Sequence, residues 1–546
     1  MMRSARLSFL LAAVLGLHVG LGTAVAQTNG TIAGQVSDAT GGVLPGVTIE
    51  AISPVLIEGG RVAVTDGQGR YTIINLRPGS YRMTFSLPGF TTVVREDLPL
   101  TAAGTLTINV ELRVGSIEES VTVSGQSPIV DVQQATRVET LSRDFMDSLP
   151  TARNFQTIGA LMPGIKLDRP DVGGARAMEQ TYMYSHGASA YHNTIQIDGM
   201  KVNSLMYDGV IQTYHNDAMH AEVTYQTGGF GAETLTGGIR LNMIPREGGN
   251  TLTGSGYFGG SHGGWQSTNN TPKLRSLGIT QGDEIDLITD LNVAVGGPIL
   301  RDKLWFFGSG RDQRVTEVVA DSFFSVSGSK EPSRTRPVSD PSRPATQAQF
   351  VRNAMVRLTY QVSPRNKFTV YMDRIFKFKE HELFFVRSDP DTAAQRRDVN
   401  NMIYYTAQAK WTSTVSSKLL LEAGYSSNIE NLSIFYQPGI RKSPPADLRT
   451  CLATPCFWDA GYNQSTPWHR QAMHWDFIRG DVWNAGYYEH NWYPERFVLS
   501  GAASYVTGSH AFKTGMQWDW GRGPTSSITM RTCSRCTSMA HRRSRG

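Results

Sequence analysis

The sequence predicts a mainly β fold in three parts: an N-terminal β-sandwich, a small α/β domain, and then part of a large antiparallel transmembrane β-barrel. Three patterns support this prediction. Short strands alternate with Gly, Pro and Asp turns over residues 28–113, and glycine-rich turns interrupt strand and helix patterns over residues 127–250. After Thr251, segments of about ten residues with strict polar and apolar alternation recur as far as residue 525.

Composition agrees with a turn-rich β protein and limits the function classes. The chain has 546 residues, 55 of them glycine, and only 18% are charged. This length exceeds one ordinary soluble domain. The formal net charge of +5 is small for the length, and basic residues cluster only at the very end. We therefore expect no nucleic-acid partner.

The first 26 residues have the pattern of a cleaved secretory signal peptide. Arg3 and Arg6 precede an apolar run over residues 7–21, and the small residues Ala24 and Ala26 predict cleavage before Gln27. An uncleaved anchor is the alternative. No later stretch approaches ~18 consecutive apolar residues, so no transmembrane helix is predicted. The chain is then periplasmic, secreted or an outer-membrane barrel.

Residues 28–113 predict a sandwich because short alternating strands meet turn signals at regular spacing. Examples are GTIAGQVSD from Gly30, the turn Asp66-Gly67-Gln68-Gly69, and the turn Pro78-Gly79 before Tyr81. This set resembles the carboxypeptidase regulatory-like domain, which has a carbohydrate-binding-like fold. The resemblance implies no peptidase activity, and it leaves two interpretations, a structural extension or a sugar-binding module.

Residues 127–250 predict a small sheet with tight turns. Ile195 and Ile197 alternate into Asp198-Gly199, a strong hairpin signal, because Gly tolerates positive φ and Asp hydrogen-bonds the turn backbone. Residues 222–225 and 239–243 form two further alternating segments, with Gly-Gly pairs between them. From this pattern alone, any small α/β domain would fit.

The residues themselves are more specific than the pattern. IDGMKVN from Ile197 and EVTYQTGGFGAETLTGGIRLNMIPREGGN from Glu222 resemble the plug domain of TonB-dependent outer-membrane receptors, as do Leu149-Pro150, Arg153-Asn154-Phe155 and Pro163-Gly164-Ile165. The resemblance implies that residues 127–250 block a barrel lumen until the energy-coupling protein TonB rearranges them. It also implies that Asp198 and Gly199 fix a plug turn, and it makes Arg240 and Arg246 candidates for ion pairs with the barrel wall.

Between the two domains, residues 117–126 read as a linker with a short extended segment. Val121 and Val123 alternate with Thr122, which suits the addition of this strand to a partner. In the family, such a segment contacts TonB, so Ile117, Val121, Thr122 and Val123 are candidate TonB contacts. A plain linker or a last strand of the sandwich is the alternative.

Residues 251–525 predict the N-terminal part of a transmembrane barrel. One face of each segment is apolar with aromatic residues near its ends, as in Val356, Leu358 and Tyr360, and the other is polar. A soluble sandwich gives similar alternation. The signal peptide and the plug-like domain favour the barrel, and residues 296–313 resemble an early barrel hairpin of Oar-like TonB-dependent receptors.

Long polar inserts, residues 321–349 and 441–494, separate some of these strands, and in such barrels long loops face outward. The second insert is rich in aromatic and His residues that suit stacking on a sugar or flat ligand, or that simply pack the loop on itself. The candidate ligand contacts are Trp458, Trp468, His469, His474 and Trp475. Cys451 and Cys456 are a candidate disulfide.

The last part of the chain departs from the expected barrel. Roughly nine or ten strands are predicted, whereas plugged transporters use about 22. An open sheet edge in a bilayer leaves backbone groups unpaired. Residues 526–546 lose the alternation and become basic. The expectation is a truncated or frameshifted gene product.

The leading hypothesis is a TonB-dependent outer-membrane receptor of a Gram-negative cell that takes up a scarce small ligand. The expected partners are TonB, outer-membrane lipid and that ligand. No catalytic motif, cofactor or metal site is predicted, so the chain is not expected to be an enzyme. The alternatives are a surface carbohydrate-binding or adhesion protein without transport, and a non-functional fragment.

Overall fold

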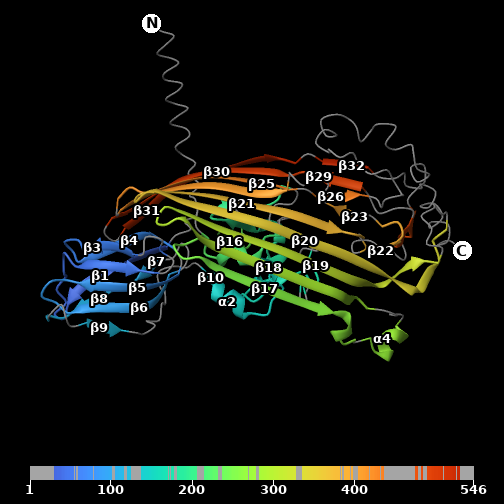
Figure 1. The fold of residues 1–546 in the computed structure, drawn as a ribbon, viewed down its shortest axis with the longest axis horizontal. Coiled ribbons are helices and arrows are strands. Elements are labelled where there is room, and N and C mark those ends of the chain that lie inside the picture. Colours follow the sequence, from blue (N-terminus) through green and yellow to red (C-terminus); the bar gives the residue numbers. More distant parts are fainter. Residues whose placement is uncertain are drawn as a thin grey trace, which may run out of the picture.

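The computed structural model describes most of the chain after residue 29. The described residues are 30–53, 56, 60–77, 79–100, 105–115, 120–123, 137–169, 171, 174–177, 181–205, 214–230, 237–268, 270–277, 282–326, 335–381, 383, 387–393, 395–397, 404–416, 418–430, 432–435, 474–476, 481–483, 489–507, 510–523 and 525–528. Figure 1 shows the sandwich at one end of the molecule and the long strands running away from it.

The N-terminal domain is a sandwich of two sheets around its own apolar core. In one sheet β1 pairs with β4, β7 and β8, and the other has the order β3-β2-β5-β6-β9. Its strands are β1 (Gly30–Asp38), β2 (Thr48–Ile52), β3 (Gly60–Val64), β4 (Arg70–Leu76), β5 (Gly79–Ser86), β6 (Thr92–Leu100), β7 (Thr105–Thr107), β8 (Val110–Leu112) and β9 (Ser120–Val123). The core includes Ile32, Ile49, Tyr71, Tyr81 and Phe85, all 4% exposed or less. Alternate residues of each strand point into this core, as the sequence pattern predicts.

The α/β domain, called here the plug domain, follows. Its main sheet has the order β10-β15-β16-β13-β14, with β13 and β16 parallel. Its strands are β10 (Arg137–Ser142), β11 (Ile165–Leu167), β12 (Met183–Ser185), β13 (Thr194–Ile197), β14 (Met200–Lys201), β15 (His220–Gly228) and β16 (Arg240–Pro245), and its helices are α2 (Arg143–Ser148), α3 (Phe155–Gly159) and the 3₁₀ turns η2 (Ala190–His192) and η3 (Asp217–Met219). Side chains of Ser142 and Asn154 cap α2 and α3 by accepting from backbone N–H groups.

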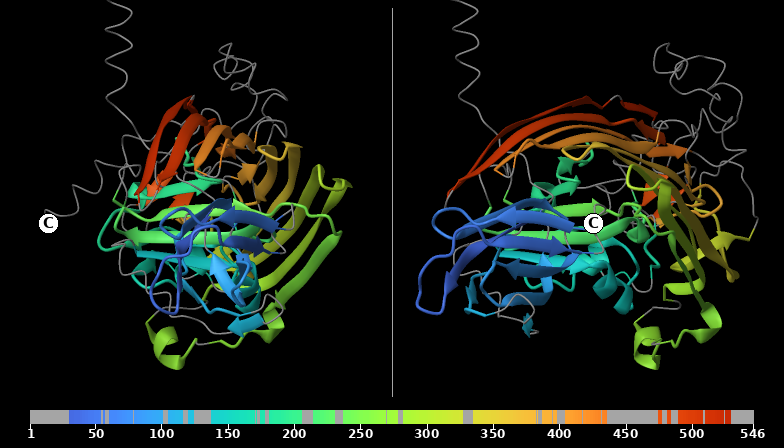
Figure 2. Two further views of the ribbon diagram at one scale, coloured as in Figure 1. Left: turned by 90° about the vertical axis from the view of Figure 1, so that its left-hand side faces the viewer. Right: turned by 60° about the vertical axis from the view of Figure 1, so that its left-hand side comes forward.

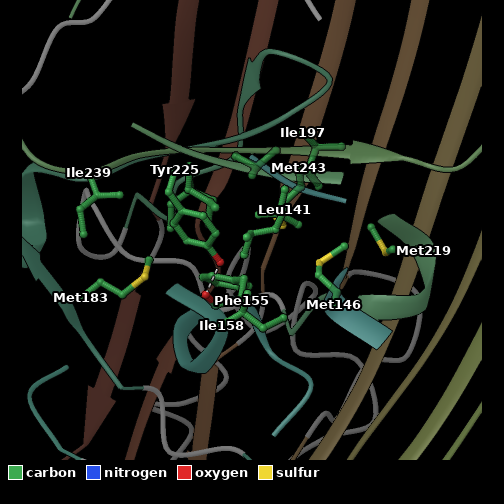
Figure 3. Close-up of a cluster of buried hydrophobic side chains, with 14 of the residues drawn as sticks. Leu141, Met146, Phe155, Ile158, Met183, Ile197, Met219, Tyr225, Ile239 and Met243 are labelled. Atoms are coloured by element: carbon green, nitrogen blue, oxygen red, sulfur yellow. Dashed lines mark hydrogen bonds between the residues drawn. The ribbon is translucent and has the colours of Figure 1, made fainter. Parts of the chain in front are cut away.

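The core of the plug domain lies between its sheet and its short helices. Figure 3 shows Leu141, Phe155 and Ile158 meeting Tyr225 and Met243, and the Tyr225 hydroxyl donates to the Phe155 carbonyl at 2.5 Å. The same cluster includes wall residues from the long sheet, namely Ala294, Phe307, Met355 and Tyr371. The plug domain and the wall therefore share one apolar core.

Nine long antiparallel strands form the wall, in the order β17-β18-β19-β20-β21-β24-β25-β30-β31. They are β17 (Thr253–His262), β18 (Glu284–Leu300), β19 (Leu304–Ser325), β20 (Ser339–Ser363), β21 (Asn366–Lys379), β24 (Tyr405–Thr414), β25 (Leu419–Ile429), β30 (Glu495–Thr507) and β31 (His510–Arg522). Figure 2 shows this sheet curving over the plug domain. Among the described strands no pairing joins β17 to β31, so the sheet has two open edges.

Shorter elements lie at the outer end of the wall, opposite the sandwich. They are η4 (Gly263–Trp265), α4 (Pro272–Ser276), β22 (Arg387–Ser388), β23 (Gln395–Arg397), β26 (Leu432–Phe435), β27 (His474–Asp476), β28 (Asp481–Trp483), β29 (Glu489–Trp492) and β32 (Thr525–Ile528). Of the predicted polar insert at residues 321–349, residues 321–325 instead belong to β19 and residues 339–349 to β20, and these two strands pair with each other. In this region the strands stay paired through their backbones although neither face has to be apolar. Alternation of polar and apolar residues therefore could not predict these strand ends.

The polarity of the wall distinguishes it from a soluble sandwich. Its convex face is mainly apolar and exposed, as at Leu291, Val356 and Val370, with a charged group at Asp312, Arg314 and Arg352, whereas its concave face buries polar side chains against the plug domain. Buried polar residues of the concave face include Asp290, Asn292, Arg311, Gln313, Arg357, Asp373, Gln408 and Asn428. A soluble sandwich has the opposite arrangement. An apolar exterior around a polar interior is the arrangement of a transmembrane barrel wall, so the predicted fold class is confirmed.

Aromatic residues mark two levels of the convex face. On β20 Phe350 and Tyr360 are ten residues apart, and on β21 Phe368 and Phe378 have the same spacing. Ten residues at about 3.4 Å each, tilted about 45°, span roughly 24 Å, close to the apolar band of outer-membrane barrels. Phe350 stacks on Phe378, with ring centroids 5.6 Å apart, at the outer level. No helix in the described part of the chain combines the length and apolarity needed to cross a bilayer.

Candidate functional site

Asp198 and Gly199 form the two-residue loop between β13 and β14. Ile197 pairs with Met200 across this loop. Both loop residues have positive φ, 50° at Asp198 and 81° at Gly199. A type I′ turn needs this conformation at both central positions, and Asp-Gly is among the sequences that adopt it most readily. The turn carries the Asp198 carboxylate toward the wall.

A buried arginine of the wall binds this carboxylate. Arg357 on β20 donates from Nη1 to Asp198 Oδ2 at 2.5 Å, and from Nη2 to Glu247 Oε1 at 2.8 Å. The Arg357 side chain is 4% exposed. One guanidinium therefore binds two carboxylates of the plug domain, one from its β13–β14 turn and one just after β16. Charge-assisted bonds of this kind fix position as well as supply energy.

Glu247 has two further cationic neighbours. Its carboxylate forms an ion pair with Arg77 of the sandwich, and Lys367 Nζ of the wall lies 4.0 Å from Oε1. Burial alone would raise the pKa of the Glu247 carboxyl, but Arg77, Lys367 and Arg357 together lower it well below its usual range. Glu247 is therefore a carboxylate at any physiological pH, and it is the point where sandwich, plug domain and wall meet.

Wall side chains also satisfy plug backbone groups around the same hairpin. Gln408 donates to the Ile197 carbonyl at 3.1 Å, Asn428 to the Val202 carbonyl at 3.0 Å, and Arg496 to the Asn203 carbonyl at 2.7 Å. A buried carbonyl without a donor is costly, so these bonds hold the short strand β14 against β24, β25 and β30.

A second charged network joins the plug domain to the wall on another side. Asp217 accepts from Arg143 and Arg153 of the plug domain, each at 3.2 Å, and from Asn292 of the wall at 3.0 Å. Arg311 of the wall pairs with Asp290 and donates to the Arg153 carbonyl at 3.0 Å. The Arg153 guanidinium also lies 3.7 Å from the ring centroid of Tyr257 on β17.

For the two arginines expected to form ion pairs with the wall, the described contacts include plug side chains and one wall ring. Arg240 donates to Gln196 and Gln226, both within the plug domain. The Arg246 guanidinium contacts the wall by lying over the ring of Phe307, 4.7 Å from the ring centroid. Ion pairs between the plug domain and the wall among the described residues include Asp198 and Glu247 with Arg357, Glu247 with Lys367, and Lys201 with Asp519, whose charged atoms lie 4.0 Å apart. Arg357 is not among the residues predicted from the sequence; the signal that could have drawn attention to it is an arginine between Val356 and Leu358, on the polar side of an alternating strand.

Only some of the candidate TonB contacts belong to the described residues. Ile117 lies outside the described residues, whereas Val121, Thr122 and Val123 belong to β9. β9 pairs in parallel with β6, with Val121 opposite Val93, and forms the edge of its sheet. This segment is thus part of the sandwich sheet, as one of the two alternatives from the sequence had it, and one of its backbone edges has no neighbouring strand among the described ones.

Most of the candidate ligand contacts in the long insert lie outside the described residues: Trp458, Trp468, His469, Cys451 and Cys456. His474 and Trp475 belong to β27, and the ring of His474 stacks on Trp483 of β28, with centroids 5.1 Å apart. A cavity of about 60 Å³ lies beside this hairpin, lined in part by Arg336, Asp389 and Trp483. Burial, and then the neighbouring Asp391, raise the pKa of Asp389 to about 6.

Comparisons with known proteins agree with this architecture. Residues 31–113 match the family described as carboxypeptidase regulatory-like domain. Over 298 residues the chain is 29% identical to the TonB-dependent transporter Oar of Myxococcus xanthus, a match that covers 52% of this chain and 27% of that protein. The match therefore covers little more than a quarter of the length of that curated relative.

Two solved structures are also similar to this chain. The outer membrane transporter YddB of Escherichia coli has a TM-score of 0.46 and 10% identity, covering 70% of this chain and 47% of that one. The siderophore receptor PirA of Acinetobacter baumannii has a TM-score of 0.43 and 12% identity, with the same coverage. From the matched domain and the curated relative, the resemblance predicted by the sequence motifs is confirmed: this chain is similar to the TonB-dependent transporter Oar, and its residues 31–113 match the carboxypeptidase regulatory-like domain.

Proposed function

We propose that this chain acts as a TonB-dependent outer-membrane receptor that takes up a scarce small ligand. It is exported by a cleaved signal peptide at residues 1–26, and its convex face contacts outer-membrane lipid. In this proposal the protein moves a ligand and catalyses no reaction. The observation that carries the proposal is a polar concave wall ion-paired to a separate plug domain through Arg357, beneath an apolar convex face.

The contacts suit a plug that must be held firmly and yet be released. Asp198 and Glu247 bind Arg357 in the closed arrangement, and wall amides bind the backbone on either side of the β13–β14 turn. Ion pairs and hydrogen bonds can be exchanged for water when the lumen opens, so the main free-energy cost of release is exposure of the apolar core that the plug domain shares with the wall. Energy supplied from the periplasm would then rearrange the plug domain and admit the ligand.

The partner in the periplasm is TonB, and the candidate contact is residues 117–124. An extended peptide can add to the free edge of β9 by backbone hydrogen bonds. The test is binding of the purified periplasmic domain of TonB to the full chain in detergent. We expect deletion of residues 117–124 to abolish binding. Thr105→Pro, which perturbs another short sandwich strand, serves as the matched control and should bind as the wild type does.

Equal binding by the deletion variant would overturn the assignment of this segment. The alternative function is a surface carbohydrate-binding or adhesion protein, and the stacked pair His474 and Trp483 at the outer end suits ligand contact. In that case the chain would bind its ligand with the same affinity with and without TonB, and cells carrying it would accumulate none. A non-functional fragment would fail to reach the outer membrane.

A further inference from the structure

We propose that the sandwich domain is a lock on the plug domain, because its β4–β5 turn holds the same carboxylate that the wall holds. Arg77 lies at this turn and binds Glu247 Oε2, while Arg357 binds Glu247 Oε1. The two side chains of the first pair are 17% and 11% exposed, so water screens them little. One plug residue is thus held by both the sandwich and the wall.

The turn that carries Arg77 is rigidly built. The hydroxyl of Tyr81, a core residue of the sandwich that is 1% exposed, donates to the Arg77 carbonyl at 2.7 Å. Asn75 has a φ of 61°, a left-handed conformation that asparagine tolerates better than most residues. Its amide donates to Thr414 Oγ1 of the wall at 3.1 Å. Arg77 is therefore presented by the folded sandwich and docked beside the short turn that follows β24.

Glu247 connects Arg77 of the sandwich to the main sheet of the plug domain. It lies two residues after the end of β16, and the N–H of the intervening Arg246 donates to the Met219 carbonyl at 2.7 Å. β16 pairs with β13, which ends in the turn that carries Asp198. The chain of contacts therefore runs from Arg77 to Glu247, through β16 to β13, and then to the Asp198–Arg357 pair.

Undocking the sandwich would remove one of three cations around a buried carboxylate. Arg357 and Lys367 would remain, but Arg357 must also bind Asp198. The plug hairpin would then open more often. If TonB pulls on β9, as the proposed function has it, the pull reaches this lock through the sandwich sheet; the lock itself does not depend on TonB or on transport.

The test is hydrogen–deuterium exchange of the full chain in detergent micelles, without ligand. We expect Arg77→Ala to make the amides of β13 and β16 exchange about tenfold faster, which is within the usual range of coupling between contacting residues. Arg77→Lys keeps the charge and should exchange as the wild type does. Arg82→Ala is the matched control, because Arg82 lies on β5 and pairs at 2.9 Å with Glu96 of the same domain, on its surface.

Wild-type exchange of β13 and β16 in Arg77→Ala would overturn the lock. Faster exchange of β1 and β5 in that variant would mean that the sandwich itself has loosened, and the decision then rests on Glu247→Gln, which leaves the sandwich sequence intact. Glu247→Gln should accelerate the plug amides, and adding Arg77→Ala to it should produce no further change. A further tenfold increase in the double variant would mean that Arg77 acts elsewhere. A chain that fails to bind TonB could still pass this test.

Discussion

At Arg357, one guanidinium from the wall meets two carboxylates from the plug domain, all of them largely buried. The net value of such a pair relative to apolar residues can be small, because each charge loses its hydration. Removing one partner is different, since it leaves the others buried without their counter-charge. Arg357 is therefore a residue whose truncation should be costly even if the pair itself adds little stability.

We expect Arg357→Ala to weaken retention of the plug domain by about 3 kcal/mol or more, the cost typical of breaking a buried pair. Limited proteolysis of the plug domain in the full chain would report this as faster cleavage. Arg314→Ala is the control, because Arg314 pairs with Asp312 at the surface and its side chain is 58% exposed. The control should cleave as the wild type does; equal rates in all three proteins would contradict the assignment.

Asp389 supports a prediction with a defined pH window. Its folded-state pKa of about 6 lies above the ordinary value of 3.8, because burial and Asp391 disfavour its charge. Folding is therefore penalised once the group must ionise, and the penalty grows between about pH 4 and pH 6 and is constant above. Asp389→Asn should slow proteolysis of the β27–β28 hairpin, which Asp389 contacts at Val482, at pH 8 and leave it unchanged at pH 4. A benefit that is equal at both pH values would contradict this pKa.

Among the elements, β20 presents opposite polarities on its two sides. Val356 and Leu358 are exposed on the convex face, while Arg357 between them is buried on the concave one. In water the exposed residues would be a liability for solubility. In a bilayer they are the contact surface, and the buried polar residues face the plug domain instead of solvent.

Val356 lies between the two aromatic levels, so a charge there should be opposed by the membrane interior. We expect Val356→Arg to destabilise the wall by about 2–4 kcal/mol in lipid, as arginine does near the midplane of barrels. Val62→Arg in the sandwich is the control, since Val62 is similarly exposed but faces water. Urea unfolding in lipid vesicles would measure both. An equal effect of the two substitutions would argue against a lipid-facing β20.

Strands and turns could be predicted from the sequence, because the alternation at Val356–Tyr360 and the Asp198-Gly199 turn signal depend only on neighbours in the chain. The partner of Asp198 could not be predicted, because Arg357 is 159 residues away and only the register of β20 brings it to the turn. The same limit explains why Arg240 and Arg246 were the expected ion-pairing residues, and why β9 could not be assigned to the sandwich with any certainty from the sequence.

For the whole molecule, the distribution of apolar cores separates the sandwich from the rest. The sandwich core contains only its own residues, whereas the plug core includes wall residues such as Phe307 and Tyr371. The contacts described here between the sandwich and the other two parts are polar, at Asn75 and Arg77. The sandwich should therefore melt as a unit of its own.

Phe85→Ala tests this division. Phe85 is fully buried and packs edge-on against Tyr71, with ring centroids 5.6 Å apart. The substitution should cost the sandwich about 3–5 kcal/mol and lower its melting temperature by more than about 10 °C. The transition of the plug domain and wall should stay in place in the same calorimetric scan. A single transition that shifts as a whole would contradict independent melting.

The shared plug core also has a consequence for assembly. The plug domain precedes the wall in the chain, yet Ala294, Phe307, Met355 and Tyr371 complete its interior. Until β18, β19, β20 and β21 are in place, Met219, for example, lacks its contact with Tyr371 of the wall. We therefore expect the plug domain to remain loosely ordered until the sheet inserts and to reach its final form together with it. If the chain is exported as proposed, periplasmic chaperones would meet an unfinished plug domain behind an already folded sandwich.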